Sequence, residues 1–457
     1  MPSGLVNKRP QMSKQLELPL GGGGEAPKTG RSGEAMAATR GNRRSGTSAL
    51  MEQVVEASNL RSALKRVRRN KGSPGIDGMT VNELAGYLRE HWPTLREQLL
   101  RGEYQPQPVL VRYIPKAGGG TRMLGIPTAV DRFIQQALLQ VLQPMIDPTF
   151  SLHSHGFRPG RSAHGALKEA KGHVETGRCW VVDVDLAKFF DCVNHDLLMG
   201  RMEKRVEDRR ALGLIRRYLE TGLMSDGVVM RRHQGTPQGG PLSPLLANVL
   251  LDDVDKELER RGHAFVRYAD DCNVYVRSER AGQRVMGLLR RLYGRLQLDI
   301  NEDKSAVAMV WHRPFLGYQL YKNRGKVGFA IAGKSIARFK DQVRDMTRRV
   351  CGRSMEQVAR KLSSYITGWK QYFQLAPGRE RRRRLDGWIR RRLRALQLKQ
   401  WKNCRTIYRN IRRLGGEYLT ALRVTRLTGR WWRAAGEASL ALPTSYFDKL
   451  GISKLVS

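Results

Sequence analysis

Two short apolar segments joined at a pair of aspartates constrain this chain more than any other feature. Residues 265–276 read Phe-Val-Arg-Tyr-Ala-Asp-Asp-Cys-Asn-Val-Tyr-Val, which predicts two strands around a tight turn at Asp270 and Asp271. Asp is a poor strand former, and adjacent carboxylates repel each other. A divalent cation would relieve that repulsion. The alternative is an ordinary surface turn, where Asp is common.

A second carboxylate-bearing strand strengthens the metal hypothesis. Residues 180–191 read Trp-Val-Val-Asp-Val-Asp-Leu-Ala-Lys-Phe-Phe-Asp, so that Asp185 stands at the end of an apolar strand and Asp183 within it. An Asp at a strand end can also cap a following helix. Two strands that deliver carboxylates to one edge can instead bind Mg²⁺, which prefers oxygen ligands. Two such ions about 3.5–4 Å apart can activate a 3′-hydroxyl and stabilise a leaving pyrophosphate.

The charge balance indicates an anionic partner. The 457 residues include 82 Lys and Arg against 42 Asp and Glu, a net charge of +40. Nucleic acid and an anionic membrane are the surfaces that offset such a charge. No apolar run of 18 residues exists, so a transmembrane helix is not expected, and neither is a signal peptide. The five cysteines include no Cys-x-x-Cys pair, which favours a reducing compartment. We therefore expect a cytoplasmic protein associated with nucleic acid and not with a membrane.

Four regions follow from the pattern along the chain. Residues 1–48 are rich in Gly, Ser and Arg and predict a disordered basic arm. Residues 49–334 predict a mixed α/β body. Residues 335–400 predict a helical domain and 401–457 a basic nucleic-acid-binding region. Between residues 376 and 435 there are 19 Lys and Arg against 3 Asp and Glu.

Within the α/β body, periodicity and turn signals predict individual elements. A hairpin is expected from strands 109–114 and 121–126, around the three glycines 118–120. Helices are expected at 49–69, 81–100, 131–142, 245–258 and 285–298.

The order of short motifs resembles the reverse transcriptases encoded by group II introns, also called intron maturases. Eight blocks carry the resemblance, at residues 72–78, 122–127, 154–160, 180–191, 234–244, 268–271, 298–305 and 315–318. The resemblance covers about residues 50–450. It implies a right-hand polymerase, in which α/β fingers and palm precede an all-α thumb of the maturase type.

The resemblance assigns roles to individual residues of these blocks. Asp185, Asp270 and Asp271 match the catalytic metal ligands, whereas Asp183 matches no ligand and is interpreted as a polar residue of the strand edge. Phe190 matches the steric gate that would exclude a ribose 2′-hydroxyl; a core aromatic, the role expected for Phe189, is the alternative.

Four further residues match positions that bind the incoming nucleotide. Lys116 and Arg122 flank the hairpin tip and match the basic residues that hold the triphosphate of the nucleotide. The alternative is that these side chains only face solvent, as basic residues on such loops often do. Gln238 lies in a Pro-Gln-Gly-Gly-Pro loop, whose glycines allow close backbone approach to a substrate. Lys304 matches a lysine near the triphosphate, with an ordinary surface lysine as the alternative.

Basic and aromatic residues supply the predicted RNA contacts. Arg158, in Phe-Arg-Pro-Gly-Arg-Ser, is predicted to contact template or nucleotide, with structural packing as an equal alternative. In the region that resembles the thumb, aromatics interleave with Arg and Lys, a pattern that suits stacking and phosphate contact. The residues predicted to bind RNA there are Trp369, Lys370, Arg390, Arg391 and Arg392.

Many relatives end in a zinc-dependent HNH endonuclease, and this sequence is expected to lack one. No His follows His312, and Cys351 and Cys404 are the cysteines beyond it. A tetrahedral Cys/His zinc site needs about four ligands. We therefore expect no zinc and no nicking of duplex DNA, so that the primer would be an existing 3′-hydroxyl.

The function that these features imply is RNA-directed DNA polymerisation combined with assistance in splicing the intron RNA. The expected cofactor is Mg²⁺ as two ions, with Mn²⁺ as a substitute. The expected partners are group II intron RNA, an RNA template with a DNA primer, dNTPs and target DNA. The alternatives are an RNA-binding splicing factor with an idle polymerase fold, and a reverse transcriptase of a retron or CRISPR-linked system.

Overall fold

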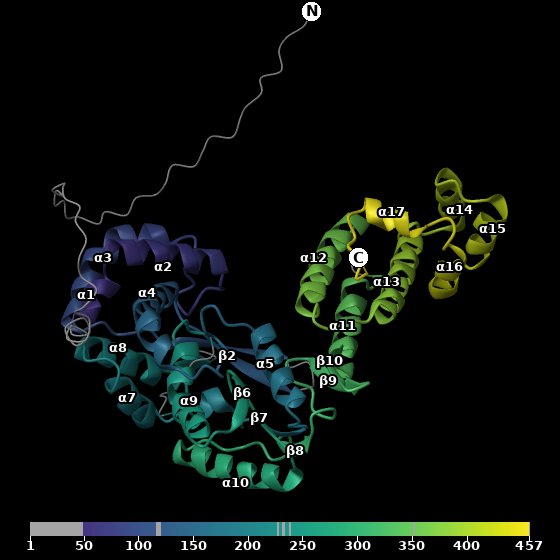
Figure 1. Ribbon diagram of the computed structural model, residues 1–457. Helices are drawn as coiled ribbons and strands as arrows, with labels where there is room; N and C mark the ends of the chain where they lie inside the picture. Colours follow the sequence, from purple (N-terminus) through teal and green to yellow (C-terminus); the bar gives the residue numbers. More distant parts are fainter. Residues whose placement is uncertain are drawn as a thin grey trace, which may run out of the picture.

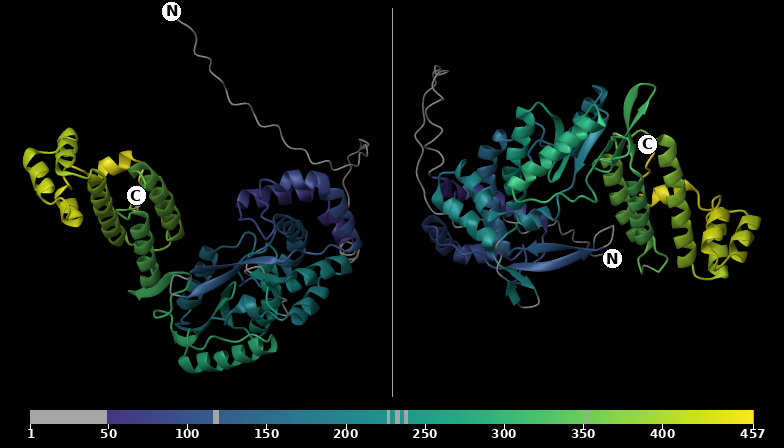
Figure 2. Two further views of the ribbon diagram at one scale, coloured as in Figure 1. Left: turned by 180° about the vertical axis from the view of Figure 1, so that it is seen from behind. Right: turned by 90° about the horizontal axis from the view of Figure 1, so that it is seen from below.

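The computed structural model describes residues 49–115, 120–225, 228–230, 234–236, 239–350 and 352–456. The expected arm over residues 1–48 lies outside these ranges. The described chain forms a mixed α/β part up to about residue 331 and a helical part after it, which lie side by side in Figures 1 and 2.

The first sheet has the strand order β2-β1-β4-β5. Its strands are β1 (Val109–Pro115), β2 (Thr121–Ile126), β4 (Leu223–Ser225) and β5 (Val228–Met230). The predicted hairpin is confirmed, because β1 and β2 pair antiparallel from Leu110 opposite Ile126 to Pro115 opposite Thr121. β1 also pairs in parallel with β4, a strand that the sequence did not indicate.

The helices of the N-terminal part pack against one another. They are α1 (Leu50–Val54), α2 (Ala57–Asn70), α3 (Leu84–Arg101) and α4 (Ala129–Ile146), followed by the short η1 (Asp147–Thr149). The sequence predicted a single helix over 49–69, but the structure breaks it into α1 and α2, because Glu56 between them takes an extended conformation. The Asn59 side chain donates to the carbonyl oxygens of Val54 and Ala137, which satisfies the broken end and ties it to α4.

The second sheet is antiparallel and has the order β6-β7-β3-β8. Its strands are β3 (Trp180–Val184), β6 (Ala264–Tyr268), β7 (Asp271–Val276) and β8 (Ala306–Met309). The accompanying helices are α5 (Ala163–Glu175), α6 (Phe189–Cys192), α7 (His195–Glu203), α8 (Arg209–Glu220), α9 (Ser243–Arg260) and α10 (Glu279–Arg295). The two strands predicted around Asp270 and Asp271 are thus confirmed as β6 and β7.

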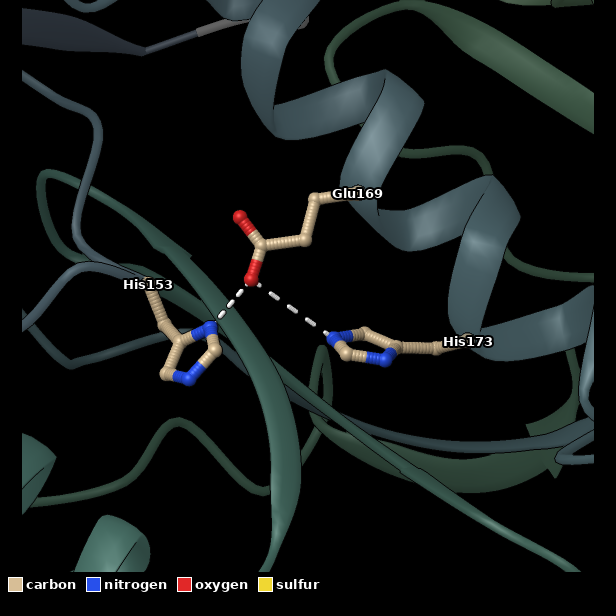
Figure 3. Close-up of side chains that lie close together, drawn as sticks. All are labelled: His153, Glu169 and His173. Atoms are coloured by element: carbon tan, nitrogen blue, oxygen red, sulfur yellow. Dashed lines mark hydrogen bonds and ion pairs between the residues drawn. The ribbon is translucent and has the colours of Figure 1, made fainter.

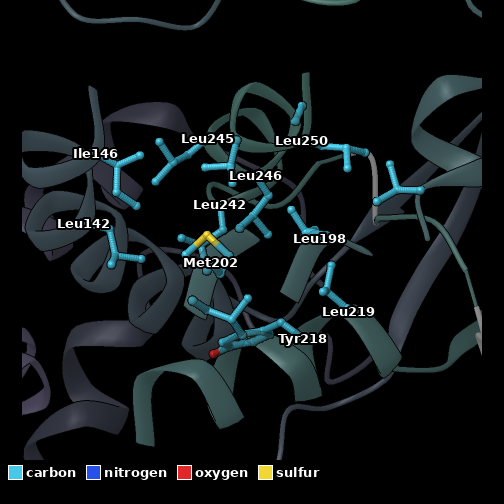
Figure 4. Packing of buried hydrophobic residues seen from close by; sticks show 14 of the residues in the cluster. Leu142, Ile146, Leu198, Met202, Tyr218, Leu219, Leu242, Leu245, Leu246 and Leu250 are labelled. Carbon is cyan, nitrogen blue, oxygen red and sulfur yellow. The ribbon is translucent and has the colours of Figure 1, made fainter. Parts of the chain in front are cut away.

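A large hydrophobic core joins the first sheet's helices to the second sheet. Figure 4 shows its centre, where side chains from α4, α7, α8 and α9 interdigitate. The labelled residues there are Leu142, Ile146, Leu198, Met202, Tyr218, Leu219, Leu242, Leu245, Leu246 and Leu250. Because four helices and one face of the second sheet share this core, the strand ends that carry the aspartates rest on a rigid base.

The helical part begins after a hairpin of β9 (Tyr318–Asn323) and β10 (Lys326–Ile331). Its helices are α11 (Gly333–Met346), α12 (Met355–Tyr372), α13 (Arg379–Gln400), α14 (Cys404–Arg413), α15 (Tyr418–Arg426), α16 (Trp431–Glu437) and α17 (Thr444–Lys449). A second hydrophobic core runs through all of them and reaches α5 and β9–β10. The division expected at residue 400 coincides with the end of α13, but one core spans both sides of it. Among the described helices, none is long and apolar enough to cross a membrane.

Candidate active site

Three aspartates meet where β3 ends and β7 begins. β3 and β7 are antiparallel neighbours, with Val184 opposite Cys272. Asp185 follows Val184, and Asp271 precedes Cys272, so their backbones lie across from each other at the same sheet edge. Asp270 stands beside them in the β6–β7 turn, which Ala269 makes possible by a left-handed backbone (φ 59°). Residues more than 80 positions apart in the sequence are thereby brought to one point.

The charges at this edge repel one another strongly. The carboxyl group of Asp271 is desolvated by the protein packed around it although the residue keeps an exposed side, and Asp270, Asp183 and Asp185 add negative charge. Together these effects raise the pKa of Asp271 to about 7. Lys304 offsets part of the charge, because its Nζ lies 3.4 Å from Asp185 Oδ1. Such an oxygen-rich set of carboxylates fits divalent metal ions, which would lower the repulsion further.

Asp183 points to the same sheet face but is held by another partner. Its Oδ2 lies 2.7 Å from Arg313 Nη2, and Arg313 Nε donates to it at 2.8 Å. Burial nevertheless raises the pKa of Asp183, with the Arg313 charge opposing that shift. Asp183 is thus occupied in an ion pair, in keeping with its interpretation as a strand residue and not a ligand.

A buried ion pair that the sequence did not suggest supports the β6–β7 turn from below. Arg267 and Asp255 are both fully buried, and Arg267 Nη2 lies 2.6 Å from Asp255 Oδ2. Arg267 Nη1 also donates to Asn248 Oδ1 at 2.9 Å and to the carbonyl oxygen of Ala269 at 2.8 Å. The arginine therefore fixes the turn that carries Asp270. The sequence feature that could have indicated this pair is Arg267 itself, a charged residue inside an otherwise apolar strand.

Phe190 lies half-buried in α6, the element that follows Asp185. Its ring meets that of Phe189 edge to face at 5.0 Å, and Phe189 is the one buried in the core. The 234–236 segment packs on α6, because Thr236 N donates to the Phe190 carbonyl at 2.7 Å. Gly235, with φ 87°, allows this approach, since a Cβ there would lie 2.8 Å from the Phe190 carbonyl oxygen. The backbone of Phe190 thus contacts this segment, and α6 follows Asp185 closely in the chain.

Three predicted nucleotide contacts cannot be placed by their side chains. Lys116 and Gln238 lie outside the described residues, and of Arg122 only the backbone is described, paired with Ile114 in the β1–β2 hairpin. The neighbouring Gly239 packs directly against the Gly125 carbonyl of β2. The described residues on either side of this gap thus contact α6 at 235–236 and the hairpin at 239.

The structure favours structural packing for Arg158 over an RNA contact. All five of its N–H donors are used inside the protein, on the Asp147 carboxylate and on the carbonyl oxygens of Asp147, Ser151 and Ser154. Its side chain is 4% exposed. A guanidinium with no free donor cannot bind a phosphate, so the predicted RNA role of Arg158 is wrong. Phe157 beside it is instead exposed.

Several of the RNA contacts predicted in the helical part are also internal. Trp369 is buried against Phe339 and Phe373, at ring distances of 4.5 and 4.8 Å. Arg390 is buried and ion-paired with Asp448 at 3.0 Å. These two predictions are wrong, because both side chains are packed inside the protein. Arg390 is covered by α17 and the segment after it.

The other predicted RNA contacts of the helical part are partly accessible. Arg392 is half-buried and donates to Thr347 Oγ1 at 2.7 Å, so it too is committed to packing. Arg391 lies over the Trp432 ring at 4.5 Å, donates to the Trp432 carbonyl oxygen and is partly exposed. Lys370 lines an open groove with Gln371, Gln374 and Lys454. Of the five residues, Lys370 and Arg391 remain the ones placed to meet RNA.

Two family models match the chain, in the order that the fold suggests. Residues 114–320 match the model for reverse transcriptase (RNA-dependent DNA polymerase), and residues 336–415 match the maturase-specific domain of group II introns. The chain is 32% identical to protein YkfC of Escherichia coli, over 61% of this chain and 84% of that protein.

This chain belongs to the group II intron reverse transcriptases.

Other comparisons with this family are more partial. The chain is 37% identical to the group II intron-encoded protein LtrA of Lactococcus lactis, over 42% of this chain and 32% of LtrA. A solved partial Cas6-RT-Cas1–Cas2 complex matches with a TM-score of 0.36 and 25% identity, over 54% of this chain and 42% of that one. The chain therefore spans most of the length of YkfC but about a third of LtrA.

Membership of this family gives the described elements their names and the chain its activity. The protein is an RNA-directed DNA polymerase with a maturase domain, an enzyme type that copies RNA into DNA and assists intron splicing. In the terms of the right-hand fold, we call the first sheet and helices α1–α4 the fingers, the second sheet the palm, and α11–α17 the thumb. The family uses divalent metal ions, and the aspartate edge of the palm fits them. An idle splicing factor and a retron or CRISPR-linked enzyme are not favoured.

Proposed function

We propose that DNA synthesis on an RNA template takes place at Asp185, Asp270 and Asp271 with two Mg²⁺ ions, which Mn²⁺ can replace. Bound there, the ions would activate the primer 3′-hydroxyl and neutralise the departing pyrophosphate. The observation that carries this proposal is the meeting of three carboxylates at the adjacent ends of β3 and β7. Extension of a labelled DNA primer on RNA, with metal ion and dNTPs each omitted in turn, tests it. Product formed without divalent metal would contradict it.

The residues around the aspartates have distinct roles in this proposal. Lys304 stands beside Asp185 and would meet the triphosphate when the metal ions bind the carboxylate. Lys116, Arg122 and Gln238 would complete the nucleotide site from the fingers. The RNA template is intron RNA of group II type, the primer is an existing DNA 3′-hydroxyl at a target site, and the enzyme works in the cytoplasm.

Phe190 should select the sugar. In the Phe190→Val variant the space that a 2′-hydroxyl needs is open, so we expect ribonucleotide incorporation relative to dNTP incorporation to rise roughly 10- to 100-fold. The measurement is single-nucleotide extension with matched rNTP and dNTP. Phe189→Val is the control: it should lower stability through a core cavity and leave the ratio unchanged. An unchanged ratio in Phe190→Val, with a change in Phe189→Val, would move the gate to Phe189.

RNA binding should survive the loss of catalysis. The Asp270→Ala variant should bind intron RNA within about twofold of the native protein, because the change lies away from the basic thumb and surface changes are worth about 0.5 kcal/mol or less. It should also still promote splicing of the intron RNA. Filter binding and a splicing time course measure the two effects. A splicing defect as deep as the polymerisation defect would show that the aspartates also serve the RNA.

The exposed face of α14 should bind nucleic acid. Arg405, Arg409 and Arg413 are exposed and follow one another at intervals of one helical turn. Reversing all three to Glu should weaken RNA binding and flatten its salt dependence, by roughly 0.7–0.9 in slope for each lost phosphate contact. Reversing Arg390, Arg391 and Arg392 would not give a clean test of RNA binding, because all three make contacts inside the protein.

The matched control for the α14 variant lies on α10. Arg280, Arg284 and Arg291 are exposed there, and their reversal changes the net charge by the same amount. Figure 1 places α10 at the end of the palm away from α14. Equal losses of affinity in both variants would mean that net charge matters and the α14 face does not.

A further inference from the structure

A cluster of three histidines and one glutamate lies behind the active-site turn, and the polymerase chemistry does not use it. His153 and His155 belong to the segment between η1 and α5. Glu169 and His173 stand one turn apart on α5, so both face the segment. Figure 3 shows His153 and His173 converging on one carboxylate oxygen of Glu169.

The ligand atoms of this cluster are close enough to share one ion. One ligand atom each from His153, Glu169 and His173 lie within 4.8 Å of one another. His153 Nδ1 contacts Glu169 Oε1, and His173 Nε2 lies 3.7 Å from the same oxygen. Two ligands of a tetrahedral zinc ion with bonds of about 2.1 Å are separated by about 3.4 Å. The His173–Glu169 spacing is near that value, whereas His153 and Glu169 are directly hydrogen-bonded and must move apart when the ion binds between them.

One nitrogen of the cluster lacks a partner that a metal would supply. His173 Nε2 is buried and has no hydrogen-bond partner among the described residues. A buried polar atom without a partner is costly, and a histidine ring nitrogen is a preferred zinc ligand. One carboxylate oxygen of Glu169 is the point on which the His153 and His173 rings converge, so Glu169 supplies the oxygen ligand of the set.

His155 completes the arrangement from the other side of the carboxylate. Its Nε2 lies 2.6 Å from Glu169 Oε2, the oxygen that His153 and His173 leave free. Ligating carboxylates are typically held in this way by a second hydrogen bond, which orients them toward the metal. The set of two imidazoles and one carboxylate suits Zn²⁺ and does not suit Mg²⁺, which takes oxygen ligands.

We propose that His153, Glu169 and His173 bind a Zn²⁺ ion, with His155 positioning Glu169. Binding displaces the proton that His153 Nδ1 shares with Glu169 in the metal-free form. This site lies in the palm, whereas the expectation of a zinc-free protein considered only the residues beyond His312. The signal in the sequence was a His-x-His pair followed by Glu and His four residues apart.

The site's position gives the ion a structural role. His155 N donates to the Arg267 carbonyl, and Arg267 N donates to the His153 carbonyl, both at 2.9 Å, so the segment is bonded to β6. Gly156, the next residue, packs directly against the backbone of Ala269 in the active-site turn. An ion that links residues 153–156 to α5 would therefore stabilise the segment that packs against the β6–β7 turn.

The test measures metal binding by the full-length protein without nucleic acid, so it is independent of polymerase activity. Tag-free protein is stripped with a chelator and titrated with Zn²⁺ against a chromophoric competitor. We expect one tightly bound Zn²⁺ per chain and a higher melting temperature with zinc. Co²⁺ should give visible absorption of a tetrahedral nitrogen and oxygen site, which Zn²⁺ removes.

Variants locate the ion within the chain. His155→Gln should weaken zinc binding by about 10- to 100-fold, the usual effect of losing a residue that orients a ligand. His173→Ala should weaken it more, and both should melt like the metal-free native protein. His91→Ala, which removes an exposed histidine on α3, should bind zinc normally. A native protein that binds no zinc, or an unchanged affinity in His173→Ala, would reduce the cluster to a hydrogen-bonded network and overturn the proposal.

Discussion

The Asp270→Ala variant should lose primer extension by at least about a thousandfold. Metal ions at the active site supply several kcal/mol of charge stabilisation in the transition state, and each 1.4 kcal/mol is a factor of about ten in rate. Asp270 lies in the turn between β6 and β7 and is not part of the core, so the variant should keep its fold. Single-turnover extension of a labelled primer on RNA measures the loss, and circular dichroism checks the fold.

Asp196→Ala is the matched control for this loss. The Asp196 side chain is 80% exposed on α7 and forms an ion pair with Arg216 at the surface. Its replacement should leave extension at the native rate, since exposed ion pairs contribute little. If Asp270→Ala extends primers near the native rate, the polymerase site lies elsewhere.

The second large effect is expected below the active-site turn. Arg267→Met removes the cation that neutralises Asp255 in a fully buried pair. Breaking a buried pair on one side costs about 3–5 kcal/mol, because the remaining charge has no partner. The Ala269 carbonyl also loses a hydrogen bond, so primer extension should fall together with stability. Urea unfolding followed by circular dichroism gives the free energy of unfolding.

Two further variants separate charge burial from packing. Arg267→Met combined with Asp255→Leu should recover much of the stability, since replacing both members of a buried pair with apolar groups is often neutral. Arg290→Met breaks the exposed Arg290–Glu302 pair and should change stability much less. A double variant as unstable as Arg267→Met would mean that lost side-chain packing, and not the unpaired carboxylate, causes the defect.

The strands of the palm could be predicted from the sequence, because each is marked by residues that are adjacent in the chain. Alternating apolar residues on both sides of Asp270 and Asp271 define β6 and β7, and the same reasoning gave β3 with Asp185 at its end. The hairpin of β1 and β2 and most helices of the α/β part were also predictable. Antiparallel pairing of two such strands then places the aspartates together without further information.

The exposure of the basic residues was harder to predict, since neither charge nor sequence position defines it. Arg390 and Arg391 are neighbours on α13, yet α17 and the segment after it bury the first, while the second lies over Trp432. Arg158 lies in a motif that suggested a nucleotide or template contact, yet its N–H groups donate to the Asp147 carboxylate and to backbone carbonyl oxygens such as that of Ser151. Whether a cation meets solvent depends on elements that are distant in the sequence.

The sequence by itself determined the family, the order of fingers, palm and thumb, and the three aspartates, because each depends on residues close together in the chain or on motif order. Only the tertiary structure decided which of these arginines are exposed, how Arg267 and Asp255 support the active-site turn, and that His153 meets His173 at Glu169. These depend on packing between segments far apart in the chain. Such packing is set by the burial of a shared core, and periodicity within one segment does not reveal its neighbours.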